Sequence, residues 1–427
     1  MRFCTATLGC KVNQYETQAM EGILISRGHS RSAAGDGNDV CIINTCAVTA
    51  ESVRKSRQAV RRMKKLEPNA LIAVCGCFSQ LDAESVAALG VDIVGGSGDR
   101  YTFLLKLESL YMNSSKTIPP SRADKFEELP PISAASSEKT RALLKIQDGC
   151  DNYCAYCIIP YARGRSRSLP LDRVAEHARS IAEQGFREII ITGIEISSYG
   201  KDLEGTPSLT DALQTISKAA PKTRLRMGSL DPCVVTEEFC DKLLDIPNLC
   251  NHFHLSLQSG CDDTLKRMGR KYDTGLVKKA ISNLRRLFPD CGITADLITG
   301  FPGETDAEFE QTLEFITDAA FSAMHIFPFS PRPGTRAADM PLQVEKSTRQ
   351  NRARIATEAA KKMTLAFQEN QIGKTVEVLF ERKRGNCWIG HSGSYLEVAV
   401  RNGGAKNELF EVRITDMIDK MVIGKIV

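Results

Sequence analysis

The chain has 427 residues, of which 42% are hydrophobic and 25% are charged. This composition excludes a disordered or fibrous chain, and the length predicts two or three domains. The formal net charge of +4 is too small by itself to indicate a polyanionic partner. The unusual feature is the presence of 15 cysteines.

The start of the chain, MRFCTATLGCKVNQYE, lacks the pattern of a signal peptide. No segment approaches the ~18 apolar residues of a membrane span. We therefore expect a cytoplasmic protein with no membrane partner. Disulfides do not persist in a reducing cytosol, so the cysteines are expected to be buried thiols, nucleophiles or metal ligands.

Short apolar segments alternate with helical patterns over residues 2–110. The predicted strands end at Leu8, Asn44, Val74 and Val94, and the predicted helices lie near Gln14–Arg27, Glu51–Leu66 and Leu81–Leu89. Crossovers of this length predict an open parallel α/β sheet in a domain of residues 1–111. Residues 112–139 carry two Pro-Pro pairs and many serines, which predicts a linker.

Longer units follow in residues 140–370. Six strands are predicted, at Leu143–Gln147, Glu188–Thr192, Leu225–Gly228, His252–Leu257, Ile293–Ile298 and Ser322–Phe327. A complete (β/α)8 barrel needs about 250 residues, so we expect a partial (β/α)6 barrel, followed by a helix over Lys346–Gln371. In residues 371–427, five short alternating segments with Gly and Asn turns predict a small β-barrel.

Three cysteines, Cys150, Cys154 and Cys157, directly follow the first barrel strand, where the active sites of β/α barrels form. A structural zinc site takes four ligands, and no fourth Cys or His follows nearby. Three ligands on a four-iron cluster would leave one iron open. A zinc knuckle or unrelated cysteines are the alternative.

This CxxxCxxC motif after the first strand of a six-unit barrel resembles the radical S-adenosylmethionine (SAM) enzymes. The resemblance implies a [4Fe-4S] cluster that binds SAM and cleaves it to methionine and a 5′-deoxyadenosyl radical. Tyr156 matches the aromatic residue that lies against the SAM adenine, although a half-buried loop aromatic explains it equally. Gly193 and Gly300 end the second and fifth strands and would allow close approach of SAM. Their alternative role is that of turn glycines.

Three further cysteines, Cys10, Cys46 and Cys77, each follow a predicted strand and precede a helix. The turns after the strands of an open parallel sheet gather at its carboxyl edge, so these thiols could meet despite their distance in sequence. Taken singly, each would be expected to be a small buried hydrophobic residue.

Motifs along nearly the whole chain resemble the methylthiotransferases, which join such an N-terminal domain to a radical SAM barrel and a C-terminal TRAM domain. They include LGCKVNQYE, NTCAVTAESVRKSR, CGCFSQ, CDNYCAYCIIPYARGRSRS and DLITGFPGET. The resemblance implies a second [4Fe-4S] cluster on Cys10, Cys46 and Cys77, where one SAM methylates the sulfur to be transferred, and a second SAM that gives the radical. We assign the remaining cysteines as non-ligands: Cys4, Cys41, Cys75, Cys233, Cys240, Cys250, Cys261, Cys291 and Cys387.

GCKVNQYE and NTCAVTAESVRKSRQ resemble the group that acts on N6-threonylcarbamoyladenosine at tRNA position 37. The implied partners are a tRNA anticodon loop and a reducing system. The alternatives are the groups acting on N6-isopentenyladenosine or on a ribosomal-protein aspartate, and a non-enzymatic zinc protein that binds RNA. Glu195 and Ser394 depart from the family pattern, which usually has His or Asn at the first position and Asn at the second.

Basic residues directly after the Cys150–Cys157 motif and within the terminal β-module are candidate contacts to RNA phosphates. They are Arg163, Arg165, Lys374 and Arg384. A third basic group, RKSRQAVRRMKK over residues 54–65, is explained equally by a solvated helix face. For the terminal module the alternative is a packed barrel with a basic rim.

Overall fold

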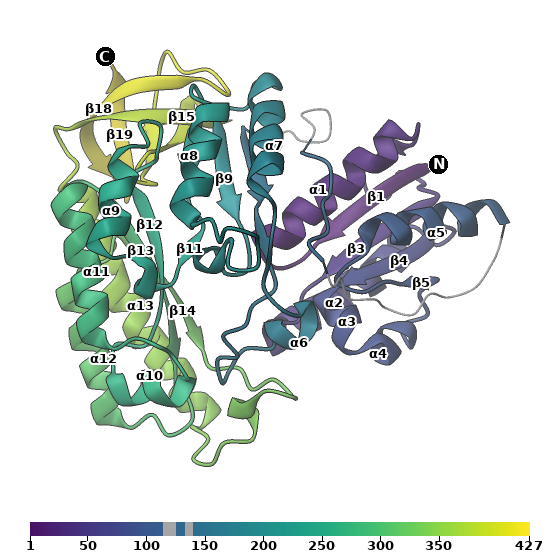
Figure 1. The fold of residues 1–427 in the computed structure, drawn as a ribbon, viewed down its shortest axis with the longest axis horizontal. Coiled ribbons are helices and arrows are strands. Elements are labelled where there is room, and N and C mark those ends of the chain that lie inside the picture. Colours follow the sequence, from purple (N-terminus) through teal and green to yellow (C-terminus); the bar gives the residue numbers. More distant parts are fainter. Residues whose placement is uncertain (114–124, 133–139) are drawn as a thin grey trace.

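The computed structural model describes residues 1–113, 125–132 and 140–427. In Figure 1 the chain passes from an N-terminal α/β unit at the right, through a central barrel, to a small β-barrel at the upper left. Residues 114–124 and 133–139 of the predicted linker lie outside the described residues. In the described segment between them, Leu129 and Ile132 are buried, and the Leu129 carbonyl accepts a hydrogen bond from Tyr15 at 3.1 Å.

The N-terminal unit contains a five-stranded parallel sheet in the order β2-β1-β3-β4-β5. Its elements are β1 (Arg2–Thr7), α1 (Lys11–Ser26), β2 (Ser30–Arg31), β3 (Val40–Thr45), α2 (Ala50–Leu66), β4 (Leu71–Gly76), α3 (Cys77–Leu81), α4 (Ala83–Ala87), β5 (Ile93–Val94) and α5 (Arg100–Asn113). Every residue of β3 is buried, as expected for the middle strand of a sheet covered on both faces. The open parallel sheet is confirmed.

The helix predicted near Leu81–Leu89 is present as α4 but is shorter, and the short helix α3 before it was not predicted. Two short helices, α3 and α4, occupy this part of the chain. They are separated at Asp82, whose carboxylate accepts a hydrogen bond from the Ser85 amide and so caps α4. An N-cap aspartate begins a helix at the next residue, and this explains the break.

The central barrel has seven parallel strands, in the sheets β6-β9-β10 and β11-β12-β13-β14. They form the six predicted units, because β10 and β11 are two parts of the third unit. Its strands are β6 (Arg141–Lys145), β9 (Glu188–Thr192), β10 (Arg224–Arg226), β11 (Ser229–Leu230), β12 (His252–Gln258), β13 (Gly292–Thr299) and β14 (Ala323–Pro328). Its helices are α6 (Ile159–Arg163), α7 (Leu171–Glu183), α8 (Leu209–Ala219), α9 (Glu237–Leu244), α10 (Asp262–Met268), α11 (Thr274–Leu287), α12 (Asp306–Ala319) and α13 (Lys346–Glu369). A two-stranded antiparallel pair, β7 (Gln147–Asp148) with β8 (Arg167–Ser168), brackets the loop after β6.

The last five strands close into a barrel in the order β15-β16-β17-β19-β18. They are β15 (Thr375–Arg384), β16 (Cys387–Ser392), β17 (Glu397–Val400), β18 (Leu409–Ile418) and β19 (Met421–Ile426). Only the β17–β19 pair is parallel among these strands. The predicted small β-barrel is thus confirmed, and its interior is apolar, with Val378, Phe380, Val398 and Val412 buried.

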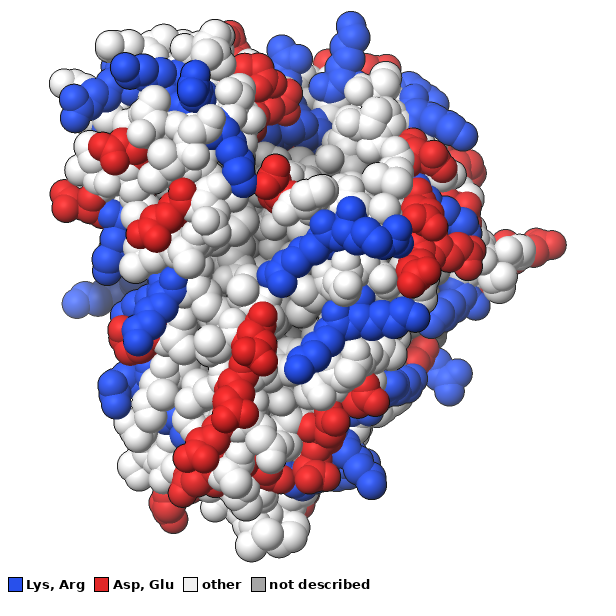
Figure 2. Space-filling view, turned by 90° about the vertical axis from the view of Figure 1, so that its left-hand side faces the viewer, with Lys and Arg blue, Asp and Glu red and all other residues white. Residues whose placement is uncertain are grey.

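The face shown in Figure 2, the left-hand side of Figure 1, has lysines and arginines interspersed with acidic residues. It therefore presents no single-sign field of the kind that attracts a polyanion. None of the helices in the described ranges is both long and apolar enough to cross a membrane.

Candidate functional site

The structure brings Cys10, Cys46 and Cys77 to the carboxyl edge of the N-terminal sheet. Cys10 precedes α1, Cys46 follows β3, and Cys77 is the first residue of α3, so each follows one of three adjacent strands. Each thiol raises the pKa of another in the set, which reflects their proximity. Cys46 and Cys77 are buried, whereas Cys10 keeps solvent contact. The three thiols therefore share one partly open site.

Close backbone packing holds this set together. Gly9 has φ +97°, and a Cβ at this residue would lie only 2.7 Å from the Cys46 Cβ and 2.8 Å from its Sγ. Only glycine fits there. The Asn13 amide donates to the Leu8 carbonyl at 2.8 Å and to the Thr45 carbonyl at 3.0 Å. Asn13 thus fixes the two turns that present Cys10 and Cys46.

Burial and one nearby cation act in opposite directions on the pKa values of this set, and burial is the larger effect. Burial raises the pKa of all three thiols, and the Arg163 guanidinium acts in the opposite direction on each of them. Metal ligation requires the thiolate form, and a nearby cation stabilises it. The donors and the adjacent charge therefore fit an iron–sulfur cluster held by three cysteines.

The second cysteine set lies in the loop that follows β6 and β7. Gly149, directly before Cys150, has φ +69°, and a Cβ there would lie 1.8 Å from the Arg165 carbonyl oxygen. The chain therefore folds back closely on itself at the start of the motif. The Cys150 amide donates to the Gly164 carbonyl at 3.1 Å, and the Cys157 amide donates to the Cys154 carbonyl at 2.9 Å. These bonds order the loop at the carboxyl end of the first barrel strand.

A buried arginine also accompanies this second set. Burial raises the pKa of Cys150 to about 11 and that of Cys157 to about 12. The Arg270 guanidinium donates to the Cys154 sulfur at 3.2 Å and pairs with Asp231 at 2.9 Å. In the described ranges no three His, Cys, Asp or Glu side chains converge on a single-ion site. A structural zinc site takes four ligands, whereas three cysteines can hold three irons of a four-iron cluster and leave the fourth open, so the donor set fits such a cluster.

The two cysteine sets are joined by α6 and α3. Helix α6 follows Cys157 and packs against α3, which begins at Cys77. Ala162 of α6 lies in one apolar cluster with Phe78 of α3, and its carbonyl accepts a hydrogen bond from the Ser97 hydroxyl at 2.6 Å. Figure 1 shows α6 beside α2 and α3. The central loop is therefore docked on the N-terminal unit between the two sets.

The expectation that Arg163 contacts RNA is corrected, because its side chain is fully buried. Its guanidinium donates to Glu16 at 2.8 Å, Asp148 at 3.1 Å and Asn13 at 2.7 Å. Three more cations complete the network: Lys145 and Arg100 pair with Glu16, and Lys145 and Arg167 pair with Asp148. Although burial alone would raise the pKa of Glu16, Arg163, Arg100 and Lys145 hold it well below its usual range. Four cations thus surround two carboxylates beside the N-terminal cysteines.

Sequence reasoning missed Glu16, Asn13 and Asp148 as parts of this site. One signal was available, because Glu16 follows Val12 and Tyr15 and precedes Ala19 on the apolar face of α1. A charged residue in such a stripe is buried only with partners. Its partners come from segments more than 80 residues away, which local patterns do not reveal.

The predicted SAM-binding residues have clear packing roles. A Cβ on Gly193 would lie 2.9 Å from both Gln147 and Ile196, and one on Gly300 would lie 2.2 Å from the Arg349 side chain. These contacts alone account for both glycines. Tyr156 packs against an apolar cluster that contains Phe301, and burial raises its pKa well above the usual range. Contact of the three residues with SAM stays a prediction.

A cavity of about 440 Å³ lies beside the Cys150 loop and is a candidate space for a cofactor. Asn152 of that loop lines it, together with Asp231 and Lys271. Glu195, which departs from the family pattern, also lines it; its carboxylate accepts a hydrogen bond from the Ser197 amide at 3.2 Å. Sequence reasoning missed Asp231 and Lys271.

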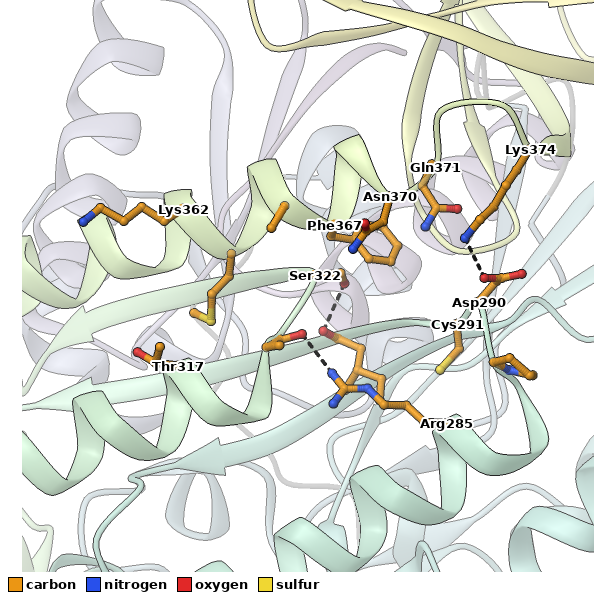
Figure 3. Close-up of a pocket in the computed structure, with 15 residues that line it drawn as sticks. Arg285, Asp290, Cys291, Thr317, Ser322, Lys362, Phe367, Asn370, Gln371 and Lys374 are labelled. Carbon is orange, nitrogen blue, oxygen red and sulfur yellow. Dashed lines mark hydrogen bonds and ion pairs between the residues drawn. The ribbon is translucent and has the colours of Figure 1, made fainter.

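The other basic candidates differ in their surroundings. Arg165 and Arg384 are exposed. Lys374 instead pairs with Asp290 at 2.7 Å and lines a cavity of about 630 Å³ (Figure 3). This cavity lies at the starts of β13 and β14, the opposite ends of the strands from the cysteine loop. Ser394 is buried, and its backbone packs on Gly292 at the junction with the central barrel.

The nine remaining cysteines are mostly buried in the core. Cys4 and Cys41 are a register pair on β1 and β3 with their sulfurs 3.3 Å apart. Cys75 lies on β4 in a core cluster different from that of Cys77. The exposed Cys233 lines the 440 Å³ cavity.

Comparison with known proteins defines the class first. Residues 144–316 match the radical SAM superfamily, and residues 2–96 match a family described as uncharacterized protein family UPF0004. The fold is also similar to that of TsrM, a radical SAM methyltransferase from Kitasatospora setae, with a TM-score of 0.59 and 15% identity over 79% of this chain and 75% of that one. The protein is therefore a radical SAM enzyme with an added N-terminal α/β unit.

Full-length relatives narrow the class to a family. The chain is 37% identical, over 98% of its length and 95% of the relative, to the threonylcarbamoyladenosine tRNA methylthiotransferase MtaB of Thermotoga maritima. It is 34% identical, over 98% of its length and 92% of the relative, to MtaB of Bacillus subtilis. A tRNA-2-methylthio-N(6)-dimethylallyladenosine synthase of Syntrophotalea carbinolica is 34% identical over 90% of each chain. The chain belongs to the radical SAM methylthiotransferase family, and it is an enzyme.

Proposed function

We propose that this protein transfers a methylthio group to C2 of N6-threonylcarbamoyladenosine at position 37 of tRNA, in the cytoplasm. The observation that carries the proposal is full-length similarity to relatives named for this reaction, at 37% and 34% identity. Relatives named for the dimethylallyladenosine reaction also match along most of the chain. That nucleoside is therefore the alternative substrate, and it is an outcome of the test below.

We infer that two [4Fe-4S] clusters are bound, one by Cys10, Cys46 and Cys77 and the other by Cys150, Cys154 and Cys157. With SAM bound, these groups supply the radical chemistry and the sulfur, which the protein's own side chains cannot provide for an unactivated C2–H bond. Each set has three cysteines and a nearby arginine, Arg163 for the first and Arg270 for the second. Three ligands leave one iron of each cluster open for an exogenous ligand.

The chain's own contribution is placement and charge. Helix α3 begins at Cys77 and packs against α6, which begins two residues after Cys157, so we propose that the substrate base binds at this junction, within reach of both cysteine sets. Arg163 and Arg270 offset the negative charge of the thiolates in a partly buried setting, where such pairing is stronger than in water. The apolar packing around Phe78 and Ala162 limits water at the junction.

The proposed RNA contact uses the exposed Arg165, beside the cysteine loop, and Arg384, on the terminal barrel. Phosphate neutralisation by such residues gives affinity without sequence preference. The unpaired bases of an anticodon loop can be extruded into a pocket. An external reducing system must supply the electron for SAM cleavage.

The experiment combines two measurements. Nucleosides from tRNA of a strain lacking this gene are compared by mass spectrometry with those of the complemented strain. We expect the 2-methylthio form of threonylcarbamoyladenosine to disappear on deletion and to return on complementation. Loss of only the 2-methylthio form of dimethylallyladenosine, also called isopentenyladenosine, would assign the alternative substrate. Iron and sulfide analysis of the anaerobically reconstituted protein is expected to give two clusters, and a single cluster would contradict the ligand assignment.

A further inference from the structure

A cavity of about 380 Å³ lies where the three parts of the chain meet, and the proposed chemistry does not use it. Lys11 and Gln14 of α1 line one side of it, and Arg141 at the start of β6 lines another. Glu381, Arg382 and Tyr395 close it from the terminal barrel. The cavity therefore opens beside the first turn of the helix that follows Cys10.

The cations of this cavity differ in their pairing. Arg141 pairs with Glu381 at 2.9 Å, and Arg382 pairs with Glu397 at 2.7 Å. The Lys11 ammonium group has no hydrogen bond or ion pair with any residue that the structure describes. It also lies within electrostatic reach of Arg226 and Arg141, both positive, as well as Glu188 and Asp296. One positive charge in the cavity thus lacks a bound anion.

The position of Lys11 is not explained by the stability of its helix. Lys11 is the first residue of α1, and a cation in the first turn opposes the helix dipole. Its side chain is exposed and turns toward the cavity, so it makes no core contact either. Local conflicts of this kind are expected where a residue serves binding.

We propose that Lys11 binds a carboxylate on the N6 substituent of the substrate adenosine. This inference rests on the proposed function. The threonylcarbamoyl substituent ends in a free carboxylate, whereas the dimethylallyl substituent is a hydrocarbon. On adenine, C2 and C6 lie on opposite sides of N1, so a base with C2 at the cysteine sets directs its N6 substituent away from them. Lys11 is adjacent to Cys10 in the chain and faces a cavity that can receive this group.

Lys11 would thereby determine specificity. A substituent without a carboxylate would leave the ammonium without its anion and would displace its water at a cost. A charge-assisted hydrogen bond from the ammonium group to the carboxylate would compensate for this loss of water. The positive charges of Arg141 and Arg382 are each offset by a glutamate, so these residues attract a second anion less strongly than Lys11 does, although Arg141 Nη1 has no hydrogen-bond partner.

The test compares two synthetic anticodon stem–loop RNAs, one with N6-threonylcarbamoyladenosine and one with its methyl ester. For the reconstituted wild-type enzyme we expect kcat/KM on the order of 10- to 100-fold higher for the free acid. Lys11→Gln should lose this preference. Its kcat/KM should fall for the free acid and change little for the methyl ester. Lys11→Arg should keep it. Lys218→Gln, an exposed lysine of α8, serves as the matched control and should behave as wild type.

Two further measurements keep the result interpretable. Iron content and 5′-deoxyadenosine formation check that Lys11→Gln holds its clusters. Fluorescence anisotropy gives the binding preference for acid over ester without turnover, and decides the question if the variant loads poorly. If Lys11→Gln retained the preference for the free acid, the role of Lys11 would be overturned, and the proposed function would still stand. Failure of the wild type to modify the acid RNA would instead reject the proposed function, and this inference with it.

Discussion

The Arg163 guanidinium donates to the Glu16 carboxylate at 2.8 Å, from the loop of the central barrel to the first helix of the N-terminal unit. Both side chains are fully buried. The same guanidinium also reaches Asn13, which fixes the turns that carry Cys10 and Cys46. This ion pair therefore connects the two cysteine-bearing regions, together with the pair between Lys145 and Glu16. We infer that it sets their relative position.

Arg163→Leu is expected to destabilise the protein by about 3–5 kcal/mol, because it leaves Glu16 and Asp148 buried with fewer partners. Denaturant unfolding of the cluster-free protein measures this change. Arg165→Leu is the matched control, since Arg165 is exposed two residues further on and its loss should change stability by at most about 0.5 kcal/mol. Equal effects of the two substitutions would contradict the role given to the buried pair.

Substitutions in the two cysteine sets should separate two steps of the reaction. Cys154→Ala should abolish SAM cleavage, because it removes a ligand of the set proposed to bind SAM. Cys46→Ala should still produce 5′-deoxyadenosine while making no methylthiolated nucleoside. Anaerobic assays that quantify both products by mass spectrometry test this division.

Cys4→Ala is the control for this pair of variants. Cys4 lies on β1, buried beside Cys41 of β3 and away from the carboxyl edge of the sheet. The Cys4→Ala protein should therefore still form both 5′-deoxyadenosine and the methylthiolated nucleoside. Loss of all SAM cleavage in a folded Cys46→Ala protein would contradict the separate roles of the two sets.

The pH dependence of the free energy of unfolding should show the contribution of the buried Glu188 carboxylate. Although burial would raise its pKa, Arg226 and Arg224 lower it to about 2. A carboxylate with a lowered pKa stabilises the fold above its unfolded value near 4.5, and this stability is lost as the pH falls toward 2. Denaturant unfolding between pH 6 and pH 3 should show part of a total contribution of about 3 kcal/mol. The decline should be shallower in Glu188→Gln and unchanged in Glu314→Gln, an exposed control on α12.

Loss of the Glu188 charge should also weaken the docking of the terminal barrel on the central barrel. Arg226 donates to the Gly393 carbonyl at 2.8 Å and to the Ser392 carbonyl at 3.0 Å, and Glu188 orients it from the other side. Limited proteolysis of Glu188→Gln should therefore release a C-terminal fragment sooner than in wild type. An unchanged cleavage pattern would mean that the apolar and backbone contacts at Gly292 suffice for docking.

Much of the fold could be predicted from local patterns. Strand β9 begins and ends where the apolar run EIIIT does, and the alternation in β12 leaves His254 half-buried between the buried Phe253 and Leu255. Cys10, Cys46 and Cys77 could be singled out because each follows a strand, and parallel topology gathers such turns at one edge. Cys150, Cys154 and Cys157 could be singled out by their close spacing after the first barrel strand. The domain boundaries at residues 111, 140 and 371 stay predictions.

The buried ion network could not be predicted in this way. Arg163 stands in a stretch rich in basic residues, YARGRSRS, which looks the same whether its side chains face solvent or the core. Its burial depends on Glu16, which lies 147 residues away in sequence, and on the docking of α6 against α3. Ion pairs between residues far apart in sequence leave no periodic pattern in the local sequence. The basic composition of this stretch therefore favoured a contact between Arg163 and RNA, whereas the structure has Arg163 in a buried ion network.

Binding of tRNA should depend on Arg384 more than on Lys374. Arg384 is exposed at the end of β15, whereas the Lys374 ammonium is held by Asp290 at 2.7 Å. Each phosphate contact to a single strand contributes about 0.7 to the slope of log affinity against log salt. Arg384→Gln should therefore weaken binding at low salt and flatten that slope by about 0.7, and Lys374→Gln should leave it nearly unchanged. Filter binding of one tRNA across a salt series measures both slopes. If the two substitutions flatten the slope equally, the ion pair with Asp290 does not withhold Lys374 from RNA; if neither does, phosphate contact by the terminal barrel at Arg384 is excluded.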